Sequence, residues 1–131
     1  MLNHLPRIVE HCSPYDRQFP FAFRSFQRIP GNVHGVYGIW FGRRCIYVGK
    51  ADSQPISTRL RQHWEHSHND GLQAWIKSKG RRLRVSYLAL SSRKNIDMYE
   101  RYFIARFQPV TNKVRYEMHQ VVPCAPERSH K

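Results

Sequence analysis

The sequence has few cysteines, few acidic residues and no long apolar run. Its three cysteines, Cys12, Cys45 and Cys124, lie far apart and form no CxxC pair. Neither a disulfide framework nor a thiolate zinc site is therefore expected. No stretch approaches the roughly 20 apolar residues of a membrane span, and the first residues lack the apolar core of a secretory signal. We expect a soluble, cytoplasmic protein.

The scarcity of acidic residues leaves a large positive charge. Nine Asp or Glu stand against 22 Lys or Arg, which gives a formal net charge of +13. Residues 35–112 hold fourteen of the basic and five of the acidic residues, so nine of the thirteen excess charges lie there. A folded domain with this charge is typical of a protein that binds a polyanion, most often nucleic acid.

Apolar residues are numerous enough for one folded domain. They make up 40% of the 131 residues, and aromatic residues make up 13%. A chain of this length typically buries about two-thirds of its unfolded surface. We divide it into an N-terminal arm over 1–34, a central domain over 35–112 and a C-terminal tail over 113–131. The arm is rich in proline, and we expect its phenylalanines to pack on the domain. They are Phe19, Phe21, Phe23 and Phe26.

The central domain alternates between strand and helix patterns. Two β-branched and aromatic runs, 35–41 and 45–49, are separated by three turn residues and predict a hairpin. Apolar residues recur at helical spacing over 56–64 and 72–76, and they alternate with polar residues over 82–90. A last amphipathic helix ends before Pro109. The order predicts an α+β fold with a small three-stranded, largely antiparallel sheet flanked by helices.

Two short motifs on the predicted hairpin resemble a known family. The tripeptides 35–37 (GVY) and 47–49 (YVG), whose tyrosines are ten residues apart, are similar to the two halves of the GIY-YIG nuclease signature. The family's later elements are an arginine, a glutamate and an asparagine, and Arg59, Glu100 and Asn112 occur in that order. The resemblance implies a DNA endonuclease that depends on a divalent metal, Mg²⁺ or Mn²⁺.

The chemistry of phosphodiester hydrolysis accounts for these residue types. The reaction needs a deprotonated water and cations that take up charge on the phosphorane. The resemblance implies that Tyr37 or Tyr47 activates the water, with a slight preference for Tyr37. Because the ordinary pKa of tyrosine is near 10, Lys50 is expected to lower it. Arg59 offers a planar fork to phosphate oxygens, and Glu100 offers Mg²⁺ an oxygen ligand.

Other polar residues have supporting roles in this hypothesis. His63 lies one helical turn after Arg59 and is expected to help stabilise the phosphate. Asn112 is expected to be positional and to hold a loop or the end of the helix that carries Glu100. The basic residues expected to contact DNA phosphates are Arg81, Arg82 and Arg84.

Three alternatives are open at this point. A basic nucleic-acid-binding module of the same fold would carry the same charge without cutting, although the complete set of polar residues disfavours it. A protein that assembles on RNA is weaker, because no aromatic RRM motif is present. His63 and His66 lie on one helical face and invite a zinc site, but their spacing is not that of HExxH.

The number of active sites bears on the oligomeric state. One chain carries one hydrolytic centre, so cutting both strands of a duplex requires two centres or a large repositioning of one. For a double-strand break we expect a homodimer on DNA, in which the phenylalanine arm is a candidate contact.

Replacing Arg81, Arg82 and Arg84 with Gln should weaken the salt dependence of DNA binding. Each phosphate contact to B-DNA contributes about −0.9 to the slope of log K against log salt concentration. Titrations of duplex DNA at several salt concentrations measure that slope. An unchanged slope would place these arginines off the DNA path.

Overall fold

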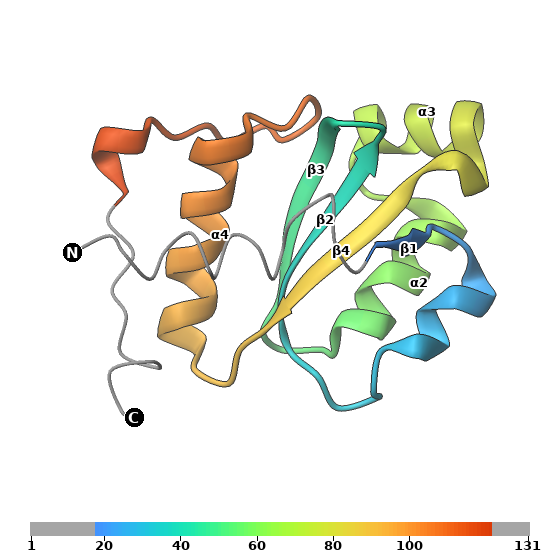
Figure 1. Ribbon diagram of the computed structural model, residues 1–131, viewed down its shortest axis with the longest axis horizontal. Helices are drawn as coiled ribbons and strands as arrows, with labels where there is room; N and C mark the ends of the chain where they lie inside the picture. Colours follow the sequence, from blue (N-terminus) through green and yellow to red (C-terminus); the bar gives the residue numbers. More distant parts are fainter. Residues whose placement is uncertain (1–17, 122–131) are drawn as a thin grey trace.

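The computed structural model describes residues 18–121, and the parts of the expected arm and tail in 1–17 and 122–131 lie outside the described residues. A four-stranded antiparallel sheet lies between α4 on one face and α2 and α3 on the other (Figure 1). Its strands are ordered β1-β4-β2-β3. Their bounds are β1 Phe19–Pro20, β2 Gly35–Phe41, β3 Arg44–Ala51 and β4 Arg84–Ala89.

The α+β class is confirmed, but the sheet has four strands where three were expected. The additional strand, β1, consists of Phe19 and Pro20 and pairs with Val85 and Arg84 of β4. A two-residue strand shows no alternation, and its proline lacks a backbone donor, so no sequence pattern marks it. The arm therefore supplies the outer strand on the β4 side of the sheet.

The helices begin and end where local sequence signals place them. Asn69 Oδ1 accepts a hydrogen bond from Leu72 N at the start of α3, and Ser92 Oγ accepts one from Asn95 N at the start of α4. α4 ends at Phe107, and the next residue, Gln108, has a left-handed backbone conformation directly before Pro109. No helix among residues 18–121 is long and apolar enough to cross a membrane. The α-helices are α2 Ile56–His66, α3 Asp70–Lys79 and α4 Arg93–Phe107, and the 3-10 helices are η2 Phe23–Arg28, η3 Gly80–Arg82 and η4 Met118–Gln120.

Alternate residues of the central strand β2 supply two separate cores. Tyr37 and Ile39 point to the face covered by α2, α3 and the arm. Val36 and Trp40 point to the face covered by α4, where Trp40 packs edge-on against Phe107 with ring centroids 4.9 Å apart. Because β2 is buried on both faces, it is an almost continuous apolar run instead of an alternating one.

Three phenylalanines of the arm are buried in the first of these cores. Phe21 and Phe26 lie against Trp64 of α2, with ring centroids 5.8 and 6.4 Å away, and Phe19 lies beside them in β1. Phe23 alone among them is exposed, at 42%. Side chains buried in their own domain cannot form an intermolecular contact, so among these four phenylalanines only Phe23 is accessible to a partner, and the expected homodimer is not supported.

Phe26→Ala should destabilise the protein far more than Phe23→Ala. Removing the fully buried ring leaves a cavity and costs about 3–5 kcal/mol. The exposed ring at position 23 contributes less than about 1 kcal/mol, even though the Arg61 guanidinium lies 5.8 Å from it. Denaturant unfolding of the two variants measures the difference. Equal small losses would show that the arm is not part of the core.

Candidate active site

Four of the residues predicted from the sequence meet at the outer edge of β3. A cavity of about 300 Å³ opens there, and Tyr47, Lys50, Arg59 and Glu100 all line it. The first two come from β3, Arg59 comes from α2 and Glu100 comes from α4. Because β3 is an edge strand with a helix on each face, a single strand end brings together groups from three elements.

Tyr47 is buried and Glu100 is half-buried at this cavity. Burial raises the pKa of Tyr47 above its ordinary value near 10, while the Arg59 guanidinium lowers it and Glu100 adds to the rise. Burial also raises the pKa of Glu100, and the carboxylates of Asp97 and Asp52 increase the rise while Lys50 opposes it. Both shifts disfavour negative charge, so the cavity gains from an added cation.

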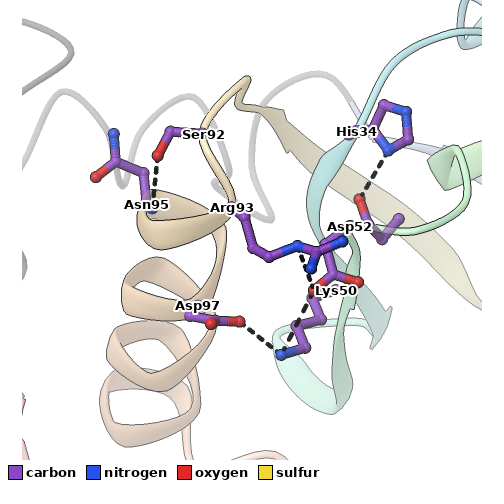
Figure 2. Close-up of polar contacts among 8 residues, drawn as sticks. His34, Lys50, Asp52, Ser92, Arg93, Asn95 and Asp97 are labelled. Carbon is purple, nitrogen blue, oxygen red and sulfur yellow. Dashed lines mark hydrogen bonds and ion pairs between the residues drawn. The ribbon is translucent and has the colours of Figure 1, made fainter.

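The Lys50 ammonium is held on the α4 side of the sheet edge. Its Nζ lies 2.6 Å from Asp97 Oδ1 and 3.8 Å from Asp52 Oδ2, and Arg93 Nε lies 3.9 Å from the same oxygen of Asp52 (Figure 2). The bond to Asp97 raises the pKa of Lys50. The cation that lowers the pKa of both tyrosines is Arg59, so the expected action of Lys50 on a tyrosine stays a prediction.

Tyr37 lies behind this cavity in a buried polar chain. Its side chain is fully buried, and its hydroxyl lies 2.9 Å from His63 Nε2. His63 Nδ1 lies 2.9 Å from Ser67 Oγ, which accepts a hydrogen bond from Asn69 N. Burial strongly raises the pKa of Tyr37. Both ring nitrogens of His63 are thus engaged inside the protein, away from the cavity where the sequence placed this side chain.

The ring of Tyr37 occupies the space that a side chain at position 49 would need, so only glycine fits there. The two residues face each other across β2 and β3. A Cβ at position 49 would overlap the hydroxyl and Cζ of Tyr37 and would lie 2.8 Å from Cε2 of Tyr47. The glycine of the second motif therefore allows the two tyrosines to pack together, with ring centroids 6.2 Å apart.

The segment after α4 covers the first half of the β3 edge. Asn112 Oδ1 accepts from Val48 N, and Asn112 Nδ2 donates to Val48 O, both at 2.9 Å. Thr111 N and Oγ1 both donate to Ile46 O, at 2.9 and 2.7 Å. On either side of Tyr47, hydrogen bonds from Thr111 and Asn112 thus take the place of pairing with a neighbouring strand. The amide of Asn112 thus contacts β3, not the end of the helix that carries Glu100 or a loop, and its expected positional role stays a prediction.

Asn69 joins the covering segment to the buried chain behind Tyr37. Its Nδ2 donates to Thr111 O at 2.9 Å, and its backbone N donates to Ser67 Oγ at 3.2 Å. A continuous series of polar contacts therefore runs from Tyr37 through the turn after α2 to the edge of β3. Sequence reasoning missed Ser67 and Asn69, since a serine and an asparagine between two helices are ordinary turn residues.

The three arginines expected to bind DNA lie away from the cavity. Arg81 and Arg82 are exposed in η3, and the Arg82 guanidinium lies 5.7 Å from the ring of Phe41. Arg84 Nη2 donates to the backbone oxygen of Gln18 at 3.3 Å. β2 separates β4 from β3, so these residues are not part of the cavity lining. Their contact with DNA stays a prediction.

The residues present suit a hard divalent cation better than zinc. Within residues 18–121, no group of three His, Cys, Asp or Glu is placed to hold a metal. Both ring nitrogens of His63, one of the two histidines considered for a zinc site, form hydrogen bonds with Tyr37 and Ser67. Mg²⁺ is commonly bound through one or two carboxylates together with waters and substrate phosphates. Glu100, a carboxylate at a cavity that disfavours negative charge, fits that pattern.

Comparison with known proteins supports the fold at this point. No family model and no curated protein matches the sequence. A similar solved structure is the GIY-YIG N-terminal endonuclease domain of UvrC from Thermotoga maritima, a tyrosine-to-phenylalanine mutant bound to its catalytic divalent cation. The TM-score is 0.55 at 21% identity, and the match covers 70% of this chain and 93% of the other. The chain therefore has the GIY-YIG nuclease fold that its motifs suggested.

The stability of the protein should fall as the pH drops below about 6.5, because His63 is held neutral. Burial lowers its pKa to about 3, and the nearby Arg59 and His68 contribute. Below pH 6.5 the His63 ring binds a proton in the unfolded chain, whereas in the folded chain it binds one only near pH 3. The free energy of unfolding then decreases by up to about 1.4 kcal/mol per pH unit.

Urea unfolding between about pH 7 and 5 tests this linkage. His63→Gln should reduce the pH dependence, whereas the matched variant His66→Gln, at an exposed histidine of the same helix, should leave it unchanged. Identical pH dependence in the wild type and both variants would mean that His63 accepts a proton in the folded state.

Proposed function

We propose that this protein is a divalent-metal-dependent endonuclease that hydrolyses DNA phosphodiester bonds. The observation that carries the proposal is one cavity that combines a tyrosine, two cations and a carboxylate: Tyr47, Arg59, Lys50 and Glu100. The fold is that of GIY-YIG nucleases, and a net charge of +13 favours a polyanionic substrate. These features together support hydrolysis over binding alone.

Tyr47 is the tyrosine to which we assign the proton of the attacking water. It lines the cavity, whereas Tyr37 is fully buried and its hydroxyl contacts His63. A general base must come within hydrogen-bond reach of the proton it takes. The Arg59 guanidinium lowers the pKa of Tyr47 and so favours the phenolate that acts as the base. Tyr37, which the sequence slightly favoured, supports the ring of Tyr47 in this proposal.

Arg59 and Lys50 supply the positive charge around the scissile phosphate. The planar guanidinium can donate two parallel hydrogen bonds to phosphate oxygens, and the ammonium acts as a point charge. Asp97 and Asp52 hold the ammonium before DNA arrives. Positioned cations of this kind stabilise the charge that develops on the phosphorane oxygens without reorganising during the reaction.

Glu100 would hold the divalent cation, either Mg²⁺ or Mn²⁺. When bound, such an ion acts as a Lewis acid that neutralises charge on the phosphate. The catalytic divalent cation of the similar UvrC domain supports this assignment. A cation bound at Glu100 would also stabilise the ionised carboxylate against the effects of burial and of the neighbouring Asp97 and Asp52, which raise its pKa.

Glu100→Ala should abolish DNA cleavage and leave DNA binding intact. The change removes the metal ligand but adds no bulk, so we expect the nicking rate of supercoiled plasmid in Mg²⁺ to fall at least about 10²-fold. Glu65→Ala, at an exposed glutamate of α2, is the matched control and should cut at the wild-type rate. A wild-type chain that binds DNA but never cuts it with Mg²⁺ or Mn²⁺ would favour the non-catalytic binding module instead.

Tyr47→Phe should lower the cleavage rate much more than Tyr37→Phe. Loss of a general base typically costs about 10²–10⁴-fold. The Tyr37 variant keeps its ring in the core and loses the buried contact of its hydroxyl with His63, so its main effect should be about 1–3 kcal/mol of stability. Single-turnover cleavage and urea unfolding of both variants separate the two roles. The reverse order of cleavage rates would identify Tyr37 as the base.

A further inference from the structure

A second cavity opens next to the first, and the two share Tyr47 and Glu100 in their walls. Its volume is about 240 Å³. His68 and the segment after α4, including Lys113 and Tyr116, form other parts of its wall. The two cavities thus meet at the tyrosine and the carboxylate proposed for hydrolysis, and a bound strand that crosses this point must continue into one of them on each side.

The wall of the second cavity suits a nucleotide. Lys113 is exposed and supplies an ammonium, and the half-buried Tyr116 supplies an aromatic ring. Val114 between them is 58% exposed. Together with Met118, it accounts for two of the three large apolar side chains exposed in residues 18–121. A cation beside exposed apolar and aromatic surface matches a phosphate beside a sugar and a base.

The position of this wall is set by the edge of β3. Lys113 directly follows Asn112, whose amide is fixed to the Val48 backbone by two hydrogen bonds. Gln108 Nε2 donates to Tyr116 O at 3.2 Å and ties the segment back to the end of α4. The segment is therefore held at a constant place relative to Tyr47, as a subsite for a substrate must be.

In-line hydrolysis assigns the second cavity to one side of the cut. The attacking water and the leaving oxygen lie on opposite sides of the phosphorus. The first cavity holds both cations proposed to bind the phosphate, Arg59 and Lys50, so the proposed function assigns the scissile phosphate and the attacking water to that cavity. We propose, on the basis of the proposed nuclease function, that the second cavity binds the nucleotide that leaves, with Lys113 contacting its nearest remaining phosphate.

The products identify which fragment leaves. The water oxygen bonds to phosphorus, the bond between phosphorus and the leaving oxygen breaks, and the proton passes to that oxygen. The leaving fragment then ends in a hydroxyl, and the other fragment keeps the phosphate. Mapping the ends produced from a DNA duplex by the wild-type chain therefore locates the phosphate that Lys113 is proposed to contact.

A charge-removal cycle tests this contact. One duplex carries a neutral methylphosphonate at the first phosphate of the leaving fragment, and a second carries it at the first phosphate beyond the scissile one on the other fragment. Lys113→Ala should lower kcat/KM about tenfold on the unmodified duplex, as should the leaving-side methylphosphonate. The variant and the leaving-side methylphosphonate together should lower kcat/KM no further than either does alone, because both remove the same contact.

Controls separate this inference from the proposed function. Lys94→Ala, at an exposed lysine near the start of α4, should cut the unmodified duplex at the wild-type rate. Either methylphosphonate should then lower kcat/KM by the same factor in this variant as in the wild type. If the effects of Lys113→Ala and the leaving-side methylphosphonate multiply as well, the subsite is wrong while the nuclease stands. Coupling only on the phosphate-bearing side would also overturn the assignment. If the wild-type chain cuts no DNA, the proposed function itself fails, and this inference fails with it.

Discussion

Two hydrogen bonds between the side-chain amide of Asn112 and the backbone of Val48 hold the strand on which the whole site depends. An edge strand exposes unpaired backbone groups, which proteins usually cover or disrupt. Here the segment after α4 covers the part of β3 that flanks Tyr47 and stops there. The following part of the strand, with Lys50 and Ala51, lines the open cavity. The place where the covering ends is thus the place where the cavity opens beside the tyrosine, and in the proposed function substrate reaches the tyrosine there.

The electrostatics of the cavity fit a site that is completed by its substrate and a cation. Burial raises the pKa of both Tyr47 and Glu100, so the isolated protein disfavours the two negative charges that hydrolysis would use. Arg59 offsets part of this penalty at the tyrosine. Lys50 is occupied by Asp97, at 2.6 Å, and is positioned before any phosphate binds. A divalent cation would offset the remaining penalty at Glu100.

The sequence predicted the elements that repeat a pattern and missed those that depend on single contacts. The hairpin follows from its two β-branched and aromatic runs, and the three helices follow from periodicity. The strand expected over 82–90 forms over Arg84–Ala89, since Arg82 belongs to a 3-10 helix, and the two tripeptides placed the tyrosines correctly on adjacent strands. β1 was missed because two residues show no period. Asp97 lies three positions before Glu100 on one helix, so helical spacing alone could have indicated it. The burial of His63 could not be predicted, because the same spacing suits a residue that faces the cavity and one that faces Tyr37.

The most direct test of this account is a paired measurement on Asn112→Ala, made under conditions where an unfolding curve shows that the variant is folded. Amide hydrogen exchange at Val48 reports whether the edge of β3 has opened, and the single-turnover rate of DNA cleavage reports whether the site has lost its geometry. The account predicts that exchange at Val48 accelerates and that cleavage falls at least about tenfold together with it. Faster exchange at Val48 with cleavage at the wild-type rate would contradict the claim that the covered edge positions the site.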